Sequence, residues 1–170
     1  TGQYAIAIGA GTVANDAAAT SVGALAEATD SFASAFGYGA RAYGSDSSAF
    51  GYNSLAEGQR AVAIGGQASA TGRNSTAVGS SAAAHSTESI GLGDATVGKD
   101  AGYGIAIGKS ARAFATNATA LGRGASAGEE NAVAIGTSAH AQKVNAIAIG
   151  NSSNAQYENS IAIGNSAKVF

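Results

Sequence analysis

The feature of this sequence that most constrains its fold is a short apolar block, closed by glycine, that recurs along the whole chain of 170 residues. The block occurs twelve times, and successive closing glycines are 14 residues apart, except for one interval of 15. A period this strict is typical of a solenoid, in which each repeat forms one unit stacked on its neighbours. We therefore predict one repetitive domain over residues 1–170. The closing glycines are Gly9, Gly23, Gly37, Gly51, Gly65, Gly79, Gly93, Gly108, Gly122, Gly136, Gly150 and Gly164.

Two short strands and two corners are predicted within each repeat. With the closing glycine counted as position 6, position 4 is Ala in ten copies and position 5 is always apolar, so small and large residues alternate over positions 2 to 5. This period of two indicates a strand, and a helix is excluded because the block is short and always ends in glycine. Positions 9 and 11 are small, with Gly98 and Val169 as the exceptions to Ala at position 11. Glycine at position 6 and asparagine at position 1, as in Asn131, suit the corners.

Each repeat therefore makes one coil of a rod. Coils stacked at the strand spacing of about 4.8 Å would give twelve coils a length of roughly 55 to 60 Å. The small faces of both strands, at positions 2, 4, 9 and 11, meet inside a flat roll in which only Ala, Gly and Ser fit. The polar face of the second strand meets water. The pattern predicts an all-β solenoid of about twelve 14-residue turns.

This packing leaves the large side chains at positions 3 and 5 pointing out of the roll. Such a strip would expose on the order of 500 Å² or more, which is larger than soluble monomers usually tolerate. Since no other segment can cover it, we predict self-association along the rod, in a number of copies that the pattern does not fix. The alternative places positions 3 and 5 inside each roll, but it leaves the alanines at positions 4 and 11 without a reason. The residues predicted to form the core of the oligomer are Ile6, Ile8, Val22, Phe36, Phe50, Ile64, Val78, Leu92, Ile107, Leu121, Ile135, Ile149 and Ile163.

The C-terminal repeats resemble those of a known family. The blocks NAVAIGTSAHAQKV (131–144), NAIAIGNSSNAQYE (145–158) and NSIAIGNSAK (159–168) are similar to the head repeats of trimeric autotransporter adhesins of the Yersinia adhesin type. The resemblance implies a left-handed parallel β-roll assembled as a homotrimer, with positions 3 and 5 facing the threefold axis. Residues 1–170 would then be a single head domain, a fragment that lacks the signal peptide, stalk and membrane anchor of the family.

The same resemblance carries the functional expectation. It implies the extracellular part of an outer-membrane protein of a Gram-negative bacterium that attaches to host cells or extracellular matrix proteins, or to copies of itself on neighbouring cells in autoagglutination. The alternative is a passive spacer that holds another binding head away from the outer membrane.

Composition and scattered titratable groups argue against other functions. A net charge of −2 with 12% charged residues favours neither nucleic acid nor an anionic membrane surface, and no apolar stretch is long enough to span a bilayer. There is no Cys, and His85 and His140 lie about four repeats apart. We therefore predict no catalytic residues, no cofactor and no metal, and a protein that is not an enzyme. Ice binding would need ladders of threonine, which Thr20, Thr76 and Thr119 are too dispersed to form.

Two groups of residues are candidates for ligand contact. Tyr38 and Tyr52 share position 7 in adjacent repeats and should stack at a corner, within an aromatic-rich stretch that includes Tyr43. Exposed tyrosines are favoured at recognition surfaces, although a stack that only stabilises the rod is the alternative. Lys109 and Arg123 also share position 7, with Arg112 nearby, and could form a basic patch, although ordinary solvated surface charge is the alternative. The candidate ligand surface is Tyr38, Tyr43, Tyr52, Lys109, Arg112 and Arg123.

One irregularity interrupts the period. The interval of 15 residues places a single extra residue within the segment from Asp94 to Gly104, which also carries Lys99 and Asp100. We predict a local bulge or a distorted corner there.

Overall fold

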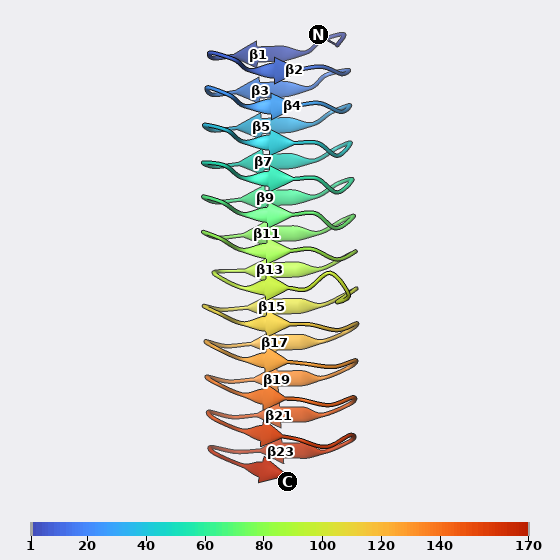
Figure 1. Cartoon of the computed structure of the whole chain (residues 1–170), viewed down its shortest axis with the longest axis vertical. Coiled ribbons are helices and arrows are strands. Elements are labelled where there is room, and N and C mark those ends of the chain that lie inside the picture. Colours follow the sequence, from blue (N-terminus) through green and yellow to red (C-terminus); the bar gives the residue numbers. More distant parts are fainter. Residues whose placement is uncertain (1, 170) are drawn as a thin grey trace.

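The structure, a computed structural model that describes residues 2–169, is a rod of stacked coils with the chain termini at opposite ends (Figure 1). Each coil contributes one strand to each of two parallel twelve-stranded sheets. The described residues include no helix. The predicted all-β solenoid of about twelve turns is therefore confirmed.

The first sheet contains the odd-numbered strands, which carry repeat positions 3 to 5. Its strands are β1 (Ile6–Ile8), β3 (Thr20–Val22), β5 (Ser34–Phe36), β7 (Ser48–Phe50), β9 (Val62–Ile64), β11 (Thr76–Val78), β13 (Ile90–Leu92), β15 (Ile105–Ile107), β17 (Thr119–Leu121), β19 (Val133–Ile135), β21 (Ile147–Ile149) and β23 (Ile161–Ile163).

The second sheet contains the even-numbered strands, which are two residues long and mostly carry positions 10 and 11. Its strands are β2 (Val13–Ala14), β4 (Glu27–Ala28), β6 (Arg41–Ala42), β8 (Leu55–Ala56), β10 (Ser69–Ala70), β12 (Ala83–Ala84), β14 (Thr96–Val97), β16 (Arg112–Ala113), β18 (Ser126–Ala127), β20 (His140–Ala141), β22 (Asn154–Ala155) and β24 (Lys168–Val169).

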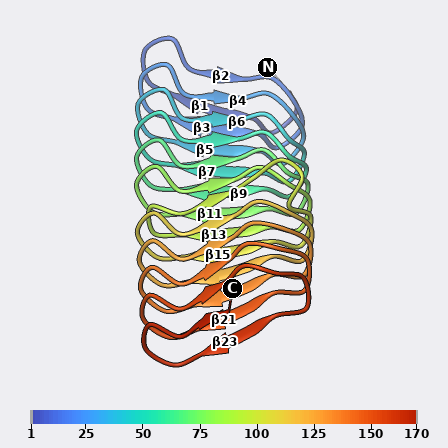
Figure 2. The same ribbon diagram turned by 60° about the horizontal axis from the view of Figure 1, so that its bottom comes forward.

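The pairing register stacks each residue on the same repeat position of the next coil. Ala134 in β19, for example, pairs with Ala148 in β21, and Ala141 in β20 pairs with Ala155 in β22. Each coil is a narrow loop, and the coils lie one upon another along the rod (Figure 2). A side chain therefore meets equivalent side chains above and below it, so columns of like residues run along the rod.

The core between the two sheets is built almost entirely from alanine. Away from the two ends of the rod, alanines at positions 2, 4, 9 and 11 are fully buried, as with Ala63, Ala70 and Ala134 at 0% exposure. The predicted inward direction of the small residues is confirmed, and the inverted packing is wrong. The physical reason is the small separation of the two strands of a coil, which leaves no room for Ile or Phe.

Both corners of a regular coil use left-handed backbone. Asparagine at position 1 and serine at position 8, such as Asn131 and Ser138, have φ of 57° and 54°. At position 6, Gly136 has φ of 127°, and a Cβ added there would lie 2.6 Å from the carbonyl oxygen of Gly150 in the next coil. Glycine is required at this corner both by conformation and by the close approach of the stacked backbone.

The irregular coil contains two changes rather than one inserted residue. β14 pairs with β12 at an interval of 13 residues (Ala83 with Thr96) and with β16 at an interval of 16 (Thr96 with Arg112). The first corner, after Leu92, is therefore one residue shorter than in the other coils. Lys99 and Asp100 are the two additional residues of the second corner, because Gly98 and the segment from Ala101 onward keep the hydrogen bonds of regular coils. One residue is lost at the first corner and two are added at the second, which gives the net gain of one residue in the 15-residue interval.

This shift corrects the identity of one core residue. Val97, and not Gly98, occupies the inward-facing position 11 of the irregular coil, and it is the largest fully buried side chain of the described chain. The inward-facing positions of the same coils are occupied by Gly91 and Gly104, so the usual small side chain is replaced there by hydrogen. A Cβ on Gly104 would lie 2.9 Å from Cγ1 of Val97. The larger side chain and the glycines thus compensate one another in volume.

Candidate functional site

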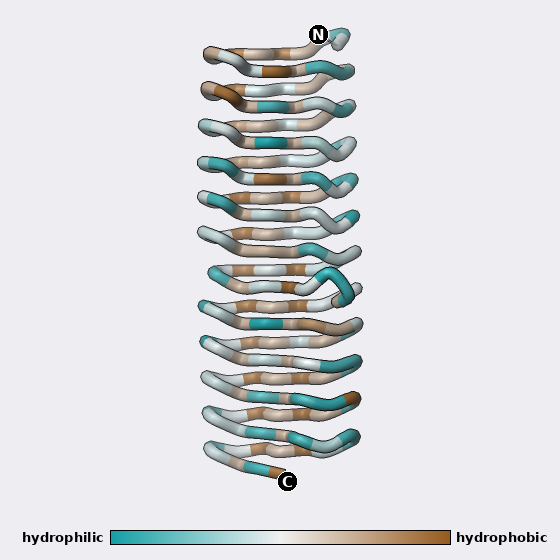
Figure 3. The backbone as a smooth tube through the Cα atoms, viewed as in Figure 1, coloured by the Kyte–Doolittle hydropathy of each residue, from teal (hydrophilic) through white to brown (hydrophobic). Residues whose placement is uncertain are grey.

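The most extensive surface feature is an apolar face formed by positions 3 and 5 of the first sheet. These side chains project away from the alanine core, and within residues 2–169 no segment packs over them. Ile64 and Phe50, in the interior of the rod, expose 41% and 37% of their surface, and Ile8 near one end exposes 60%. Apolar residues recur along the odd-numbered strands in Figure 3. The predicted outward direction of this face is confirmed.

Two coils of this face combine a large residue at position 5 with a small residue at position 3. Two successive coils carry Phe36 and Phe50 at position 5, with ring centroids 4.9 Å apart and planes within 6° of parallel. The same two coils carry Ser34 and Ser48 at position 3, where other coils carry Ile, Val or Thr. In these two coils the small serine offsets the large phenylalanine beside it.

The predicted tyrosine stack is present at the first corner. The rings of Tyr38 and Tyr52 lie 5.8 Å apart with an interplanar angle of 15°, and both are more than half exposed. Tyr43 lies elsewhere, on the second sheet directly after β6, where its hydroxyl donates to the carboxylate of Glu27. Partial burial, and then the hydrogen bond to Glu27, raise the pKa of Tyr43. The structure therefore separates Tyr43 from the exposed tyrosine pair.

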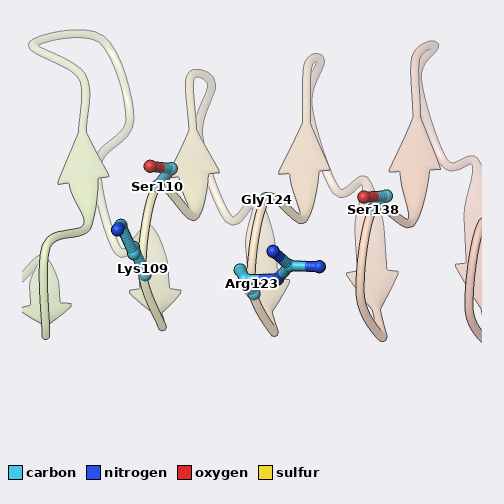
Figure 4. A pocket seen from close by; sticks show the side chains of 5 residues that line it. All are labelled: Lys109, Ser110, Arg123, Gly124 and Ser138. Carbon is cyan, nitrogen blue, oxygen red and sulfur yellow. The ribbon is translucent and has the colours of Figure 1, made fainter.

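The basic residues divide in a similar way. Lys109 and Arg123 come from the first corner of successive coils and line an open groove of about 340 Å³ (Figure 4). Arg112 lies on β16 of the second sheet and is not among the lining residues. The groove is completed by Ser110, Gly124 and Ser138, which the sequence argument did not select although all three share position 8.

The irregular coil places a lysine near a histidine. Partial burial, and then the positive charge of Lys99, lower the pKa of His85. The Nδ1 atom of His85 lies 3.1 Å from the hydroxyl oxygen of Thr71 in the preceding coil. On the other side, the hydroxyl of Thr116 donates to the carbonyl of Asp100 at 3.2 Å. Of the two additional residues, Asp100 is thus bonded to the coil that follows, whereas Lys99 acts on His85 of the preceding coil through its charge alone.

No cluster of metal-binding side chains is found in the part of the chain that the structure describes: no three of its His, Asp and Glu residues gather where they could hold an ion. In the same range, no helix has the length and hydropathy needed to cross a membrane.

Comparison with known proteins identifies the repeat. The family model of the YadA head domain repeat matches most of the chain, and its longest interruption, residues 83–100, coincides with the irregular coil. A search of curated proteins found no match. The matched ranges are residues 1–26, 28–54, 56–82, 101–125, 127–153 and 141–167.

Among solved structures, the chain is similar to the collagen-binding domain of the Yersinia adhesin YadA. The identity is 23%, the alignment covers 100% of this chain and 78% of that chain, and the TM-score is 0.47. The family assignment rests on the repeat model, which covers well over half of the sequence. This chain belongs to the YadA head-domain family, the heads of trimeric autotransporter adhesins.

Proposed function

We propose that this chain is the binding head of a homotrimeric adhesin, displayed on the outer surface of a Gram-negative bacterium, that attaches the cell to host cells or extracellular matrix proteins. The observation that carries the proposal is the continuous apolar face on one side of a rod that belongs to the YadA head-domain family.

The apolar face supports self-association because its cost in water is large. Twelve coils each present one large apolar side chain at position 5, and seven present a second at position 3. Covering each side chain is worth roughly 1.5 to 3 kcal/mol, so the full face contributes tens of kcal/mol as an upper bound. The residues named above as the predicted oligomer core are those that we assign to the trimer axis.

Three copies fit the size matching on this face. Around a threefold axis each coil position meets itself, so a layer of three Phe36 side chains must be offset by smaller neighbours. Ser34 and Ser48 supply those small neighbours beside Phe36 and Phe50. The family membership supports the trimeric state, and the paired sizes in these two coils are consistent with one filled layer per coil.

The surface that the trimer leaves exposed supports attachment to matrix proteins or cells. The second sheet and both corners of each copy remain available to a partner, and the tyrosine pair and the basic groove lie at the first corner. In the YadA structure the corresponding domain is described as collagen-binding. We extend to this chain the broader role, a surface that meets extracellular matrix or host cells.

The oligomeric state is the first test. Light scattering behind a sizing column should give a mass near three times 16.3 kDa. Ile135→Asp on the apolar face should dissociate the assembly, whereas Ser126→Asp on the second sheet should leave it intact. Circular dichroism will show whether the strands persist, and the milder Ile135→Ser serves if they do not. A soluble wild-type monomer would contradict the proposal.

Attachment itself is tested with the trimer displayed on a bacterium that otherwise does not adhere. Binding to cultured cells or to immobilised matrix proteins, compared with the undecorated strain, should increase. Mixing bacteria that display the trimer with bacteria that do not distinguishes autoagglutination from binding to other surfaces, because autoagglutination requires the trimer on both cells. If decorated cells neither attach nor agglutinate, the rod is the passive spacer that holds another head away from the membrane.

A further inference from the structure

The column of side chains at position 8, on the first corner of the rod, is interrupted twice within three coils. In most regular coils this position carries a left-handed residue with a side chain, such as Ser81 or Ser152, although the N-terminal coils also have glycine there, at Gly11 and Gly39. The shortened corner of the irregular coil has no such residue, and two coils further on the position is Gly124. Ser110, between these two places, is therefore flanked on both sides by coils without a side chain at position 8.

Cationic side chains lie directly beside the two coils that lack a side chain at position 8. Lys109 and Arg123 precede Ser110 and Gly124 in the chain, are exposed, and line the groove of about 340 Å³ together with the hydroxyls of Ser110 and Ser138 (Figure 4). Neither cation forms an ion pair or a side-chain hydrogen bond within residues 2–169. Asp94, one coil before Lys109 in the same column, is also unpaired with it. The amino and guanidinium groups are thus available to an external acceptor.

The chemistry of the groove selects an anion with several oxygen atoms. An ammonium, a guanidinium and two hydroxyls offer many hydrogen-bond donors, whereas the lining includes no carboxylate. Sulfate and carboxylate groups present the matching acceptors, and hydrogen bonds between charged partners are the stronger kind. The protein as a whole carries a net charge of −2, so attraction of a polyanion would be a local property of this corner.

The same corner continues beyond the groove as a neutral polar strip. In the next coils position 7 is Thr137, Asn151 and Asn165, of which the two asparagines are joined by an amide hydrogen bond of 3.2 Å. Position 8 of the last two coils is Ser152 and Ser166. Hydroxyl and amide groups at intervals of about 4.8 Å suit the hydroxyls of a linear sugar chain. Such a strip offers no apolar pocket for the side chains of a peptide.

We propose that the first corner of the coils containing β15 to β19 binds an anionic polysaccharide, with a sulfate or carboxylate held by Lys109 and Arg123 and the sugar chain lying along the polar strip. This inference rests on the proposed function, for which it names a ligand class. A homotrimer carries three such grooves, so a polysaccharide that reached more than one of them would gain avidity.

The test uses the purified trimer and surface plasmon resonance against immobilised heparin, which carries sulfate and carboxylate, and hyaluronan, which carries carboxylate alone. Lys109→Gln/Arg123→Gln should weaken heparin binding about tenfold or more, because two charge-assisted contacts are lost. Arg60→Gln/Arg73→Gln changes the net charge equally on exposed residues of the second corner, away from the groove, and it should bind as the wild type does. Binding to heparin only assigns a sulfate, and binding to both assigns a carboxylate.

Several outcomes would overturn the inference. Equal weakening by both double variants would indicate a non-specific charge effect. Unchanged heparin binding by the groove variant would exclude the assigned site. The proposed ligand class would be excluded if the wild type bound neither polysaccharide, or if it bound polyglutamate more tightly than both polysaccharides.

Attachment of decorated bacteria is measured in parallel, which keeps the two proposals apart. If bacteria attach equally with the wild-type and groove-variant trimers, adhesion stands and the groove assignment fails. Groove-dependent heparin binding without any attachment to cells or matrix would leave the site in place and contradict the adhesin function.

Discussion

The second corner is built from different residues in the two halves of the rod, which meet at the irregular coil. In the C-terminal half, Asn117, Asn131, Asn145 and Asn159 occupy position 1 of successive coils, and their side-chain amides form a ladder of hydrogen bonds of 3.0 to 3.1 Å. The N-terminal half has no such ladder among its described residues. There position 1 is Tyr4, Ala18, Phe32, Asp46, Arg60, Asn74 and Glu88.

The backbone conformation is nevertheless the same in both halves. The N-terminal residues at position 1 all have φ between 52° and 64°, in the left-handed region that residues such as Phe32 and Ala18 rarely adopt. This conformation costs roughly 1 to 2 kcal/mol for a residue other than Gly, Asn or Asp. The stacking of coil upon coil therefore dictates the corner, and the residue at position 1 only adjusts its stability.

The residue at position 13, at the same corner, also differs along the rod. The N-terminal half has Gly44, Gly58 and Gly72, where an added Cβ would lie only 2.2, 2.0 and 1.9 Å from a carbonyl oxygen of the next coil. The C-terminal half accepts Ala115 and, beyond it, charged and aromatic residues at the same position. The corner is thus tighter in these three coils, whereas Asp16 and Asp30 in the first two coils and the residues of the C-terminal half have a side chain at this position.

The largest effect is expected from exchanging these corner residues. Gly58→Ala should destabilise the protein by about 3 kcal/mol, because the backbone of the next coil must move to admit the methyl group. Ala115→Gly, the matched change in the other half, should cost only about 0.5 to 1 kcal/mol through the entropy of the unfolded chain. Denaturant unfolding at fixed protein concentration measures both. Equal costs would mean that the two corners do not differ in packing.

The asparagine ladder should give the next largest effect. Asn131→Ala removes two amide hydrogen bonds and places Ala in left-handed backbone, so we expect a loss of about 1 to 2 kcal/mol in the free energy of unfolding. Arg60→Ala makes a comparable truncation where no ladder exists, and it should change stability by less than about 0.5 kcal/mol. If the two variants lose the same amount, the ladder contributes nothing beyond the side chains themselves.

A smaller gain is expected from building a ladder in the N-terminal half. Arg60→Asn lies between Asp46 and Asn74, which already occupy position 1 of the neighbouring coils. Asparagine is better tolerated in left-handed backbone and can bond to both neighbours, so stability should rise by about 1 kcal/mol. Thermal unfolding of the variant beside wild type and Arg60→Ala measures the gain. A midpoint at or below that of the alanine variant would show that the N-terminal corner cannot align the amides.

The regular coils could be predicted from the sequence because each repeat position has one physical task. Alanine at positions 4 and 11 has no reason other than a narrow core, and glycine at position 6 has none other than a tight corner. The irregular coil could not be resolved in the same way, since a net gain of one residue does not reveal that one was lost and two were added. The order of core residues there, Val97 instead of Gly98, depends on pairing with both neighbouring coils.

The candidate surfaces were predictable only where they follow a column. Tyr38 and Tyr52 stack because they share a repeat position, and Lys109 and Arg123 line one groove for the same reason. Arg112 is close to Lys109 in sequence but lies on the other sheet. Proximity along the chain is therefore a weaker guide in this fold than the repeat position.

The smallest expected effect is a pH dependence of stability that arises at the junction of the two halves. There partial burial, and then the positive charge of Lys99, lower the pKa of His85 below its usual value of 6.5. As the pH falls through about 6.5, the unfolded chain binds a proton that the folded chain does not, so this contribution to stability is present above that pH and is lost below it. The thermal midpoint should therefore fall less between about pH 7.5 and pH 5.5 in His85→Gln than in wild type. Lys99→Gln should reduce the fall by a smaller amount, since burial is the larger cause. If His85→Gln loses as much stability as the wild type over this range, His85 does not couple folding to pH.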